Sequence, residues 1–339
     1  MKNANIIFTE PYVAKLIEKE IGHPGAGEVL VRSVRDTISS GTERANFIGD
    51  ANINSTKAPG VSFPRQNGYS IAGIVEEVGE GVKSVSVGDR VACSWTKHAK
   101  YNILKEEKVY RLDPSIGFDA GALVHIATFP LAAVRKCKLE IGESAIVMGL
   151  GVLGLISVKL LRAAGAVPII ACDPIEEKRQ QALSIGADYA LDPFDPEFSK
   201  KAKELTNGGA KVAIEVTGKG SGLDGALDCM APFGRVALLG CTRDSDFSID
   251  YYRKVHGRGV TLIGAHTQAR PKKDSFDGWW SERDDALSII EMLGYGRLTL
   301  ADLVGEVHSP CEAQEIFTRL ASDRSFPVVQ FDWEVFDQK

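Results

Sequence analysis

A chain of 339 residues, with 44% hydrophobic and 25% charged side chains, is long enough for about two globular domains. Its formal net charge of -5 argues against nucleic acid as a partner, because phosphate binding requires a basic surface. No apolar stretch reaches the roughly 18 residues of a membrane helix, and the N-terminus lacks the apolar segment of a signal peptide. We therefore expect a cytoplasmic protein with no membrane partner.

Six cysteines are spread along the chain without a C-x-x-C pair. Closely paired cysteines would indicate a structural zinc lobe, and an even set in a small secreted chain would indicate disulfides. Neither pattern is present in the sequence. Reduced and mostly buried thiols are expected at Cys93, Cys137, Cys172, Cys229, Cys241 and Cys311.

The N-terminal third of the chain alternates short β-rich runs with turns. Runs at residues 27–34, 70–78 and 98–104 are rich in branched and apolar side chains. Short strands separated by turns at this spacing are typical of a compact β-barrel. We expect that architecture for the first part of the chain.

From Ser144 onward the pattern changes to strands that alternate with helical stretches. Six strands of this kind predict an α/β fold with a doubly wound parallel sheet. The strand candidates are residues 144–149, 167–173, 189–192, 212–218, 235–240 and 260–266.

Three glycines at G-x-G-x-x-G spacing, Gly149, Gly151 and Gly154, follow the first of these strands and precede an apolar helix over 155–164. Such a loop lets backbone amides and the positive end of a helix dipole approach a pyrophosphate. The second strand ends in Asp173, where a carboxylate would accept hydrogen bonds from an adenosine ribose. A purely structural glycine turn would not need that acid, so we predict a dinucleotide site.

Asp173 favours NAD over NADP, because its charge would repel a 2′-phosphate and no arginine follows it immediately. Lys178 and Arg179 are the nearby cations that argue for NADP. The remaining residues expected around the cofactor are Val152, Leu153, Lys178, Thr217, Gly240 and Gly264.

A polar and aromatic stretch begins after the sixth strand candidate. His266 lies at the edge of the sheet where ligands bind in open α/β folds, although it could equally cap a loop. Trp279 and Trp280 offer stacking surface to a sugar ring or flat ligand, with packing at a subunit interface as the alternative. An amphipathic helix is predicted over 284–292, and a final strand over 326–333 could rejoin the barrel.

Together these features resemble the medium-chain dehydrogenase/reductase superfamily over nearly the whole chain. The motifs that carry the resemblance are the dinucleotide loop and residues 40–43, 67–73, 77–82, 87–91 and 98–101. The resemblance implies a GroES-like catalytic domain over 1–126 and 267–339 and a Rossmann domain over 127–266. It also implies a homodimer or homotetramer, with residues 260–263 as the candidate edge strand.

Zinc-containing members of the family bind their catalytic metal through a cysteine before Gly-Thr-Asp, a histidine and a glutamate after a glycine, and a further cysteine or glutamate. By motif, the corresponding positions here are Ser40, Tyr69, Ser70 and His125. A serine and a phenol are poor replacements for thiolate and imidazole ligands. We therefore expect no zinc or other metal, with a site built from His125 and Cys93 as the alternative.

Without a metal, side-chain donors must stabilise the substrate oxygen during hydride transfer. Tyr69 is the first candidate for the acid/base, because a phenol can donate to a carbonyl and its pKa can fall beside a cation. His125 is the second candidate, because an imidazole titrates near neutrality. The resemblance assigns Thr42 to a proton relay, and Ser40 and Glu43 could orient the substrate.

These candidates also have structural interpretations. A tyrosine in a β-barrel is often part of the core or of an interface. His125 lies in the apolar run 122–127, where a buried and hydrogen-bonded histidine is common. Glu43 could simply pair with Arg44 or another cation.

The predicted function is NAD-dependent oxidation of a CH–OH group, or reduction of the matching ketone, in a small molecule such as a sugar, polyol or cyclitol. Residues 40–44 and 68–70 resemble a zinc-less branch that includes bacteriochlorophyllide-dehydrogenase-like proteins and dehydrogenase modules of carbohydrate pathways. One alternative is a reductase of activated C=C bonds or quinones. A non-catalytic dinucleotide-binding protein is another, although the retained protic side chains argue against it.

Overall fold

Two structural units divide the chain in the computed structural model, which describes residues 1–50, 62–242, 245 and 247–336. The first unit comprises Met1–Ile126 and Ala286–Lys339, and the second comprises Ala127–Asp285. Within the described ranges, no helix is both long enough and apolar enough to cross a membrane.

The second unit is built on a six-stranded parallel sheet with the strand order β11-β10-β9-β12-β13-β14. This is the doubly wound order of a Rossmann fold, as the alternation of strands and helices predicted. Strands β9 and β10 are buried on both faces, which explains their continuous apolar sequences. The six strands are β9 (Ala145–Met148), β10 (Ile169–Cys172), β11 (Tyr189–Leu191), β12 (Ala210–Glu215), β13 (Met230–Leu238) and β14 (Thr261–Gly264).

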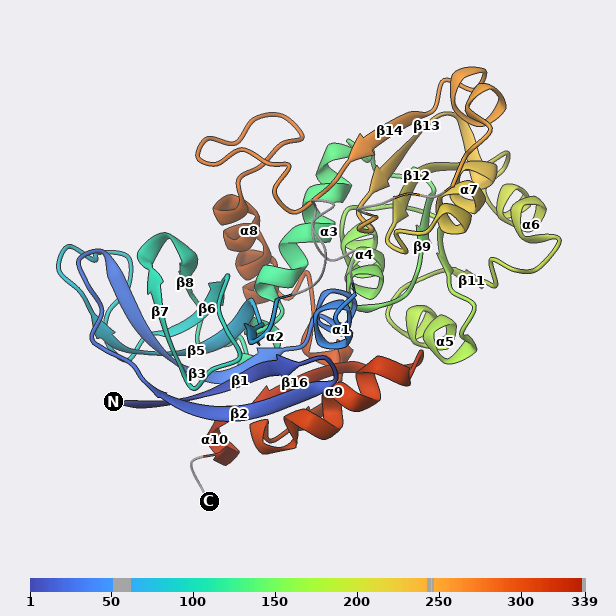
Figure 1. Ribbon diagram of the computed structural model, residues 1–339. Coiled ribbons are helices and arrows are strands. Elements are labelled where there is room, and N and C mark those ends of the chain that lie inside the picture. Colours follow the sequence, from blue (N-terminus) through green and yellow to red (C-terminus); the bar gives the residue numbers. More distant parts are fainter. Residues whose placement is uncertain (51–61, 243–244, 246, 337–339) are drawn as a thin grey trace. The chain divides into compact units, whose positions relative to one another are not determined.

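Helices cover the sheet of the second unit. Figure 1 shows α4 beside β9, α7 against β12 and β13, and α6 next to α7, while α5 packs on β10 and β11. The apolar core beneath these helices includes Met148, Ile170, Leu227 and Val236. The helices are α4 (Val152–Ala163), α5 (Glu176–Ser184), α6 (Phe198–Leu205) and α7 (Gly220–Cys229).

The segment 267–285 belongs to the second unit, whereas the sequence placed it with the catalytic domain. Helix α3 (Val124–Lys136) holds it through two cations. Arg135 donates to Asp285 at 2.8 Å, and Lys136 donates to the Ala269 carbonyl at 2.6 Å. These contacts link residues more than 120 positions apart, so no local pattern could have revealed them.

The first unit contains a seven-stranded sheet with the order β15-β16-β3-β5-β6-β8, in which β7 also pairs with β3. The predicted final strand, β16, runs antiparallel to β3 and so rejoins the N-terminal strands. A second sheet has the order β2-β1-β4. The strands are β1 (Lys2–Glu10), β2 (Val13–Glu20), β3 (Glu28–Thr37), β4 (Arg65–Gln66), β5 (Ser70–Val78), β6 (Arg90–Ser94), β7 (Tyr101–Lys105), β8 (Val109–Arg111), β15 (Val304–His308) and β16 (Val328–Asp332).

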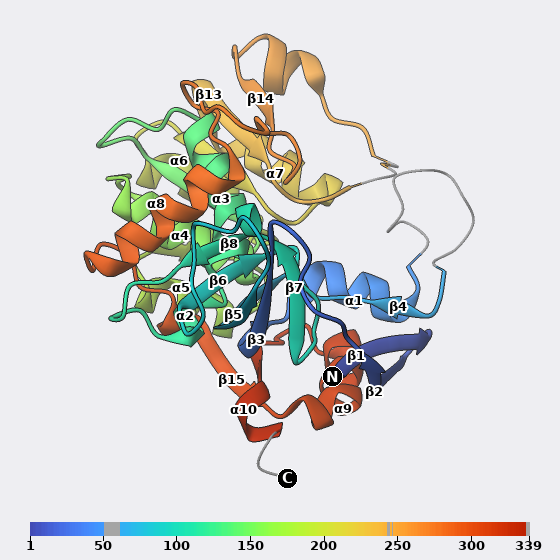
Figure 2. The same cartoon turned by 90° about the vertical axis from the view of Figure 1, so that its left-hand side faces the viewer.

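Aromatic packing fixes helix α1 in the first unit. The rings of Phe8 and Phe317 lie 4.7 Å apart, and Phe47 of α1 lies 5.2 Å from Phe8. Figure 2 shows α9 beside β2, and α9 also packs on α1. The helices of this unit are α1 (Ser40–Ile48), α2 (Phe118–Gly121), α8 (Glu282–Gly294, which begins in the second unit), α9 (Ala313–Ser322) and α10 (Trp333–Phe336).

Candidate functional site

The glycine loop of the second unit connects β9 to α4 and has the geometry of a dinucleotide cradle. Gly149 adopts φ +96°, which favours glycine. A Cβ at Gly154 would lie 1.9 Å from the Gly149 carbonyl oxygen, so only glycine allows this close packing. A Cβ at Gly151 would meet nothing within 4 Å, which leaves open space beside the loop. Val152 and Leu153 form the first turn of α4, whose amides attract anions.

Asp173 contacts this loop directly. Its carboxylate accepts hydrogen bonds from the backbone N–H groups of Leu150 and Ile175, each at 2.9 Å. A carboxylate has about four lone-pair sites, so two hydrogen bonds leave capacity for ribose hydroxyls. Arg179 donates to the carbonyl oxygen of Asp173 at 2.7 Å, which places a cation next to the acid. Lys178 is half-buried in α5.

The loops after β12 and β13 meet beside the dinucleotide loop. Thr217 packs so closely that a Cβ at Gly149 would lie 3.0 Å from its methyl carbon, and a Cβ at Gly240 would lie 2.2 Å from the Gly218 nitrogen. The buried carboxylate of Glu215 holds this region by accepting from the Thr217 N–H at 2.7 Å. Burial raises the Glu215 pKa, although the hydrogen bonds lower it. The sequence analysis did not identify Glu215. Gly264 ends β14, and a Cβ there would also meet open space.

This arrangement fits a dinucleotide cofactor. Neighbouring parallel strands present their carboxyl ends at one edge of the sheet, where such ligands bind. The glycine loop provides the approach for a pyrophosphate, and Asp173 provides acceptors for a ribose.

Hydroxyl groups surround Tyr69 in the first unit. The Tyr69 hydroxyl donates to Ser39 Oγ and is also hydrogen-bonded to the Thr42 side chain. Ser40 opens α1 and is half-buried, and Thr42 is exposed to solvent. The structure therefore brings the hydroxyl groups of Tyr69, Thr42 and Ser39 together.

The pKa of Tyr69 shifts opposite to the expected direction. Burial raises it well above its usual value, and the nearby Glu43 carboxylate raises it further. The hydrogen bonds with Ser39 and Thr42 lower it, but they do not outweigh the burial. The expectation that this pKa would fall is wrong, because the phenol is buried and because the charge beside it is an anion. Tyr69 is thus a neutral hydroxyl at physiological pH.

Three rings meet beside this hydroxyl cluster. Tyr69 and His125 lie edge to face, with ring centroids 5.6 Å apart, and Trp95 lies 4.9 Å from His125 and 6.2 Å from Tyr69. His125 is buried in the first turn of α3. Trp95 is 40% exposed and has φ +58°, a rare conformation for a bulky residue. The sequence analysis missed Trp95, and its only local signal was a large aromatic at the end of a strand.

Glu43 does not face open space beside Tyr69. Its carboxylate accepts from the Ser39 N–H at 2.8 Å and pairs with His98 Nε2 at 2.6 Å. The other ring nitrogen of His98 pairs with Asp36 at 3.0 Å. Arg44, which follows Glu43 in the sequence, does not pair with it but donates to the carbonyl of Ala321. Both oxygens of Glu43 are thus engaged within the protein, by Ser39 and His98. His98 is a second residue that no sequence pattern identified.

The expected substrate residues after β14 lie within the second unit. His266 is exposed, and its Nδ1 accepts from the Gln268 N–H at 3.2 Å, which matches the loop-capping alternative. The Arg135 guanidinium lies 3.6 Å from the Trp280 ring centroid, and Lys136 Nζ lies 4.5 Å from that of Trp279. Both indole rings are therefore engaged by cations of α3.

Two family models match the chain. The alcohol dehydrogenase GroES-like domain matches residues 25–140, and the zinc-binding dehydrogenase model matches residues 152–279. L-threonine 3-dehydrogenase of Thermococcus kodakarensis is 30% identical over 270 residues, which cover 69% of this chain and 74% of the relative. D-guloside 3-dehydrogenase of Escherichia coli is 27% identical over 322 residues, 89% of this chain and 91% of the relative.

The fold is shared with solved structures. The crystal structure of 2R,3R-butanediol dehydrogenase from Bacillus subtilis superposes with a TM-score of 0.81 at 23% identity. The superposition covers 97% of this chain and 99% of that one.

The expectation that the chain has no place for zinc is contradicted by these matches. The model over residues 152–279 is that of zinc-binding dehydrogenases, so zinc is the metal that the family implies.

The described side chains do not fit a zinc ion. Over residues 1–50, 62–242, 245 and 247–336, no group of three or more His, Cys, Asp and Glu side chains is placed to hold a metal. Ser70 donates its hydroxyl to the Ala122 carbonyl at 2.6 Å. Cys93 packs in the apolar core of the first unit, where burial raises its pKa. Among the four mapped ligand positions, only His125 carries a common zinc ligand.

The two matching models, the coverage of the relatives and the shared fold agree with each other. The chain therefore belongs to the medium-chain dehydrogenase/reductase superfamily of alcohol-dehydrogenase-like oxidoreductases.

Proposed function

We propose that this chain interconverts a secondary alcohol and the corresponding ketone with NAD(H), and that its substrate is a cyclic polyhydroxy compound such as a sugar, glycoside or cyclitol. The observation that carries the proposal is the neutral Tyr69 hydroxyl, placed between Ser39 and Thr42 and beside the rings of His125 and Trp95.

Tyr69 is proposed to bind the substrate oxygen. A neutral phenol can donate a hydrogen bond to a ketone or to the oxygen that becomes negative during reaction. One such donor in a site from which water is excluded typically contributes about 3 kcal/mol. Because burial and Glu43 disfavour a free tyrosinate, Tyr69 serves as a donor rather than as a standing base.

Proton transfer is proposed to run through the hydroxyl cluster. In the oxidative direction, Tyr69 accepts the alcohol proton as its own proton passes to a neighbouring hydroxyl, which releases its proton toward solvent in turn. Thr42 is exposed, so it can exchange that proton with solvent without a charged phenolate intermediate. His125, in edge-to-face contact with Tyr69, is the second candidate acceptor.

The cofactor is proposed to bind at the glycine loop of the second unit. Gly149, Gly151 and Gly154 would hold the pyrophosphate at the N-terminus of α4, and Asp173 would bind the ribose hydroxyls. When bound, a nicotinamide dinucleotide supplies the hydride acceptor or donor. NAD is preferred over NADP because the Asp173 charge repels a 2′-phosphate, although Arg179 lies next to it.

Two observations support a cyclic polyhydroxy substrate. Trp95 presents a partly exposed indole beside Tyr69, and an aromatic face stacks well on the apolar face of a sugar ring. The D-guloside 3-dehydrogenase relative covers most of the chain, and its name describes oxidation of a glycoside.

The test is a panel of substrates in which turnover is measured by the absorbance of the reduced cofactor. Glycosides, polyols, cyclitols, L-threonine and 2,3-butanediol would be assayed with NAD and with NADP, and enones and quinones with NADH and with NADPH. Each assay would use protein as isolated and protein with added Zn²⁺. We expect turnover of a cyclic polyol or glycoside with NAD. Turnover confined to enones or quinones would replace the proposal with C=C or quinone reduction. NADH binding without turnover of any compound would identify a dinucleotide-binding protein.

A further inference from the structure

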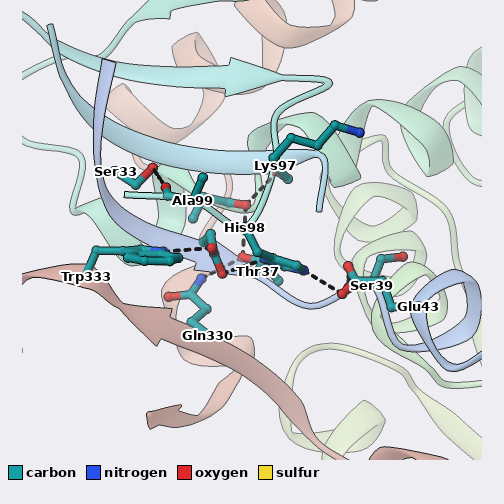
Figure 3. Close-up of polar contacts among 12 residues, drawn as sticks. Ser33, Thr37, Ser39, Glu43, Lys97, His98, Ala99, Gln330 and Trp333 are labelled. Carbon is teal, nitrogen blue, oxygen red and sulfur yellow. Dashed lines mark hydrogen bonds and ion pairs between the residues drawn. The ribbon is translucent and has the colours of Figure 1, made fainter. Parts of the chain in front are cut away.

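Two carboxylates and one imidazole are buried together in the first unit and are connected to Tyr69 through Ser39. Asp36, at the end of β3, and Glu43, in α1, pair with opposite nitrogens of His98 at 3.0 and 2.6 Å. All three side chains are at most 1% exposed. Figure 3 shows His98 between Trp333 on one side and Ser39 and Glu43 on the other. Trp333 Nε1 donates to the second oxygen of Asp36 at 2.8 Å.

His98 is charged in this setting. Burial lowers its pKa, but the charges of Asp36 and Glu43 raise it to about 10. Buried ion pairs of this kind are poor sources of stability, because removing charges from water costs about as much as the pairing returns. We therefore expect the main effect of this charged cluster to be on the position of the nearby Tyr69 hydroxyl, rather than on the stability of the fold.

The backbone of His98 holds the chain just before Tyr69. Its N–H donates to the carbonyl of Asn67 at 2.8 Å. Gly68 adopts φ +97°, and a Cβ there would lie 2.5 Å from the His98 nitrogen. Only glycine permits this approach, so residues 67–69 are fixed against His98.

The side chain of His98 holds the other end of Tyr69 through Glu43. One Glu43 oxygen pairs with His98, and the other accepts the Ser39 N–H at 2.8 Å. Ser39 precedes α1, and its Oγ accepts the hydrogen bond of the Tyr69 hydroxyl. His98 is thus connected both to the backbone before Tyr69 and to the acceptor at the tip of its side chain.

We propose that His98 and Glu43 are positioning residues, which fix the Tyr69 hydroxyl for reaction without touching the substrate. This inference rests on the proposed role of Tyr69. It replaces the expectation that Glu43 orients the substrate directly, since both of its oxygens are engaged within the protein.

A double-mutant cycle tests the coupling. His98→Gln, Tyr69→Phe and the double variant would be compared by steady-state kinetics on the substrate found in the panel. We expect His98→Gln to lower kcat about tenfold when Tyr69 is present and less than about twofold in the Tyr69→Phe background, while KM stays within about twofold. A purely structural role would give the same loss in both backgrounds, and that result would overturn the proposal.

Glu43→Gln provides a second variant in case His98→Gln does not fold. The carboxylate accepts from Ser39 and His98 at once, whereas an amide offers only one oxygen, so one of the two contacts must be lost. We expect the same coupling to Tyr69. The matched control is His308→Gln. His308 also lies between two carboxylates of the first unit, those of Glu306 and Glu312. It belongs to β15, which is distant in sequence from Tyr69. It should leave kcat unchanged.

Hydrogen–deuterium exchange supplies a measurement that needs no substrate. In His98→Gln, amides at 39–43 and 67–70 should exchange faster than in the wild type, while NADH affinity stays the same. Faster exchange with no turnover by any variant would refute the proposed function but leave the positioning contact intact. Unchanged exchange at both segments would refute the positioning inference alone.

Discussion

The carboxylate of Asp173 accepts a hydrogen bond from the backbone N–H of Leu150 at 2.9 Å. The residue expected to recognise the ribose therefore also fixes the shape of the loop expected to hold the pyrophosphate. One side chain therefore connects the proposed ribose site to the proposed pyrophosphate loop.

Asp173→Asn should change cofactor preference. The amide oxygen can replace only one of the two acceptors for Leu150 and Ile175, so NADH affinity should fall. Loss of the charge removes repulsion toward a 2′-phosphate, so the NADPH to NADH affinity ratio should rise about tenfold, equivalent to about 1.4 kcal/mol. Fluorescence titration with both cofactors measures this ratio. Asp188→Asn is the control, because Asp188 also accepts a backbone N–H, that of Ile169. An unchanged ratio would contradict the assignment of Asp173.

Gly151→Ala should weaken dinucleotide binding without unfolding the protein. The added methyl group meets nothing within 4 Å, so the melting temperature should not change. The same methyl group would occupy the space through which a pyrophosphate approaches, and we expect NADH affinity to fall by about tenfold or more. Gly117→Ala, where a Cβ also meets nothing, serves as the control. Equal affinity in wild type and variant would place the cofactor elsewhere.

Tyr69→Phe should lower kcat roughly 100-fold, the typical effect of removing one donor to a developing oxyanion. The ring contacts with His125 and Trp95 remain, so substrate KM should change little. Steady-state kinetics on the best panel substrate provide the measurement. Tyr110→Phe removes another buried phenol of the same unit, one that is hydrogen-bonded to Ser94, and controls for lost stability. Full activity in the Tyr69 variant would exclude this residue from the chemistry.

Trp95→Ala should raise KM about tenfold with a smaller effect on kcat, because a stacking face is lost but no proton-transfer group is removed. The comparison of cyclic with acyclic substrates sharpens the test, since only the former should be affected. Phe233→Ala is a suitable control, because Phe233 is also an exposed aromatic with positive φ, in the second unit. Equal losses on both substrate types would argue against ring stacking.

His98 should make stability depend on pH above neutrality. Its pKa is 6.5 when unperturbed and about 10 in the folded protein, so the folded state binds its proton more tightly. The resulting stabilisation is complete below pH 6.5 and is lost as the pH rises toward 10, by up to about 1.4 kcal/mol per pH unit. Urea unfolding of wild type and His98→Gln at pH 6.5, 8 and 9.5 measures the difference. Parallel pH profiles for both proteins would show that His98 is not charged.

Features encoded locally could be predicted from the sequence. The glycine spacing, the acid at the end of β10 and the alternation of strands and helices predicted the Rossmann sheet and its cofactor loop. The short β-rich runs predicted the N-terminal strands, and the final strand predicted to rejoin them is confirmed by the pairing of β16 with β3.

Features that depend on distant contacts could not be predicted in the same way. The pairing of Glu43 with His98 spans 55 residues, and that of Asp36 with Trp333 spans 297. The sequence left two roles open for Glu43, orienting the substrate or pairing with Arg44 or another cation, and no local pattern identifies His98 as the cation with which it pairs. The pKa of Tyr69 is raised rather than lowered because the phenol is buried, and because a carboxylate rather than a cation lies beside it. The expectation of no zinc relied on ligand positions alone and is contradicted by the family to which the chain belongs.

The hydrogen bond from Trp333 to Asp36 has a consequence for how the protein is made. A ribosome releases Asp36, Glu43 and His98 early, but the indole that completes their surroundings emerges only after more than two hundred further residues. A nascent chain can therefore assemble the parallel sheet of the second unit before the surroundings of Asp36 and His98 are complete, and a truncation that removes Trp333 would remove the hydrogen-bond donor to Asp36.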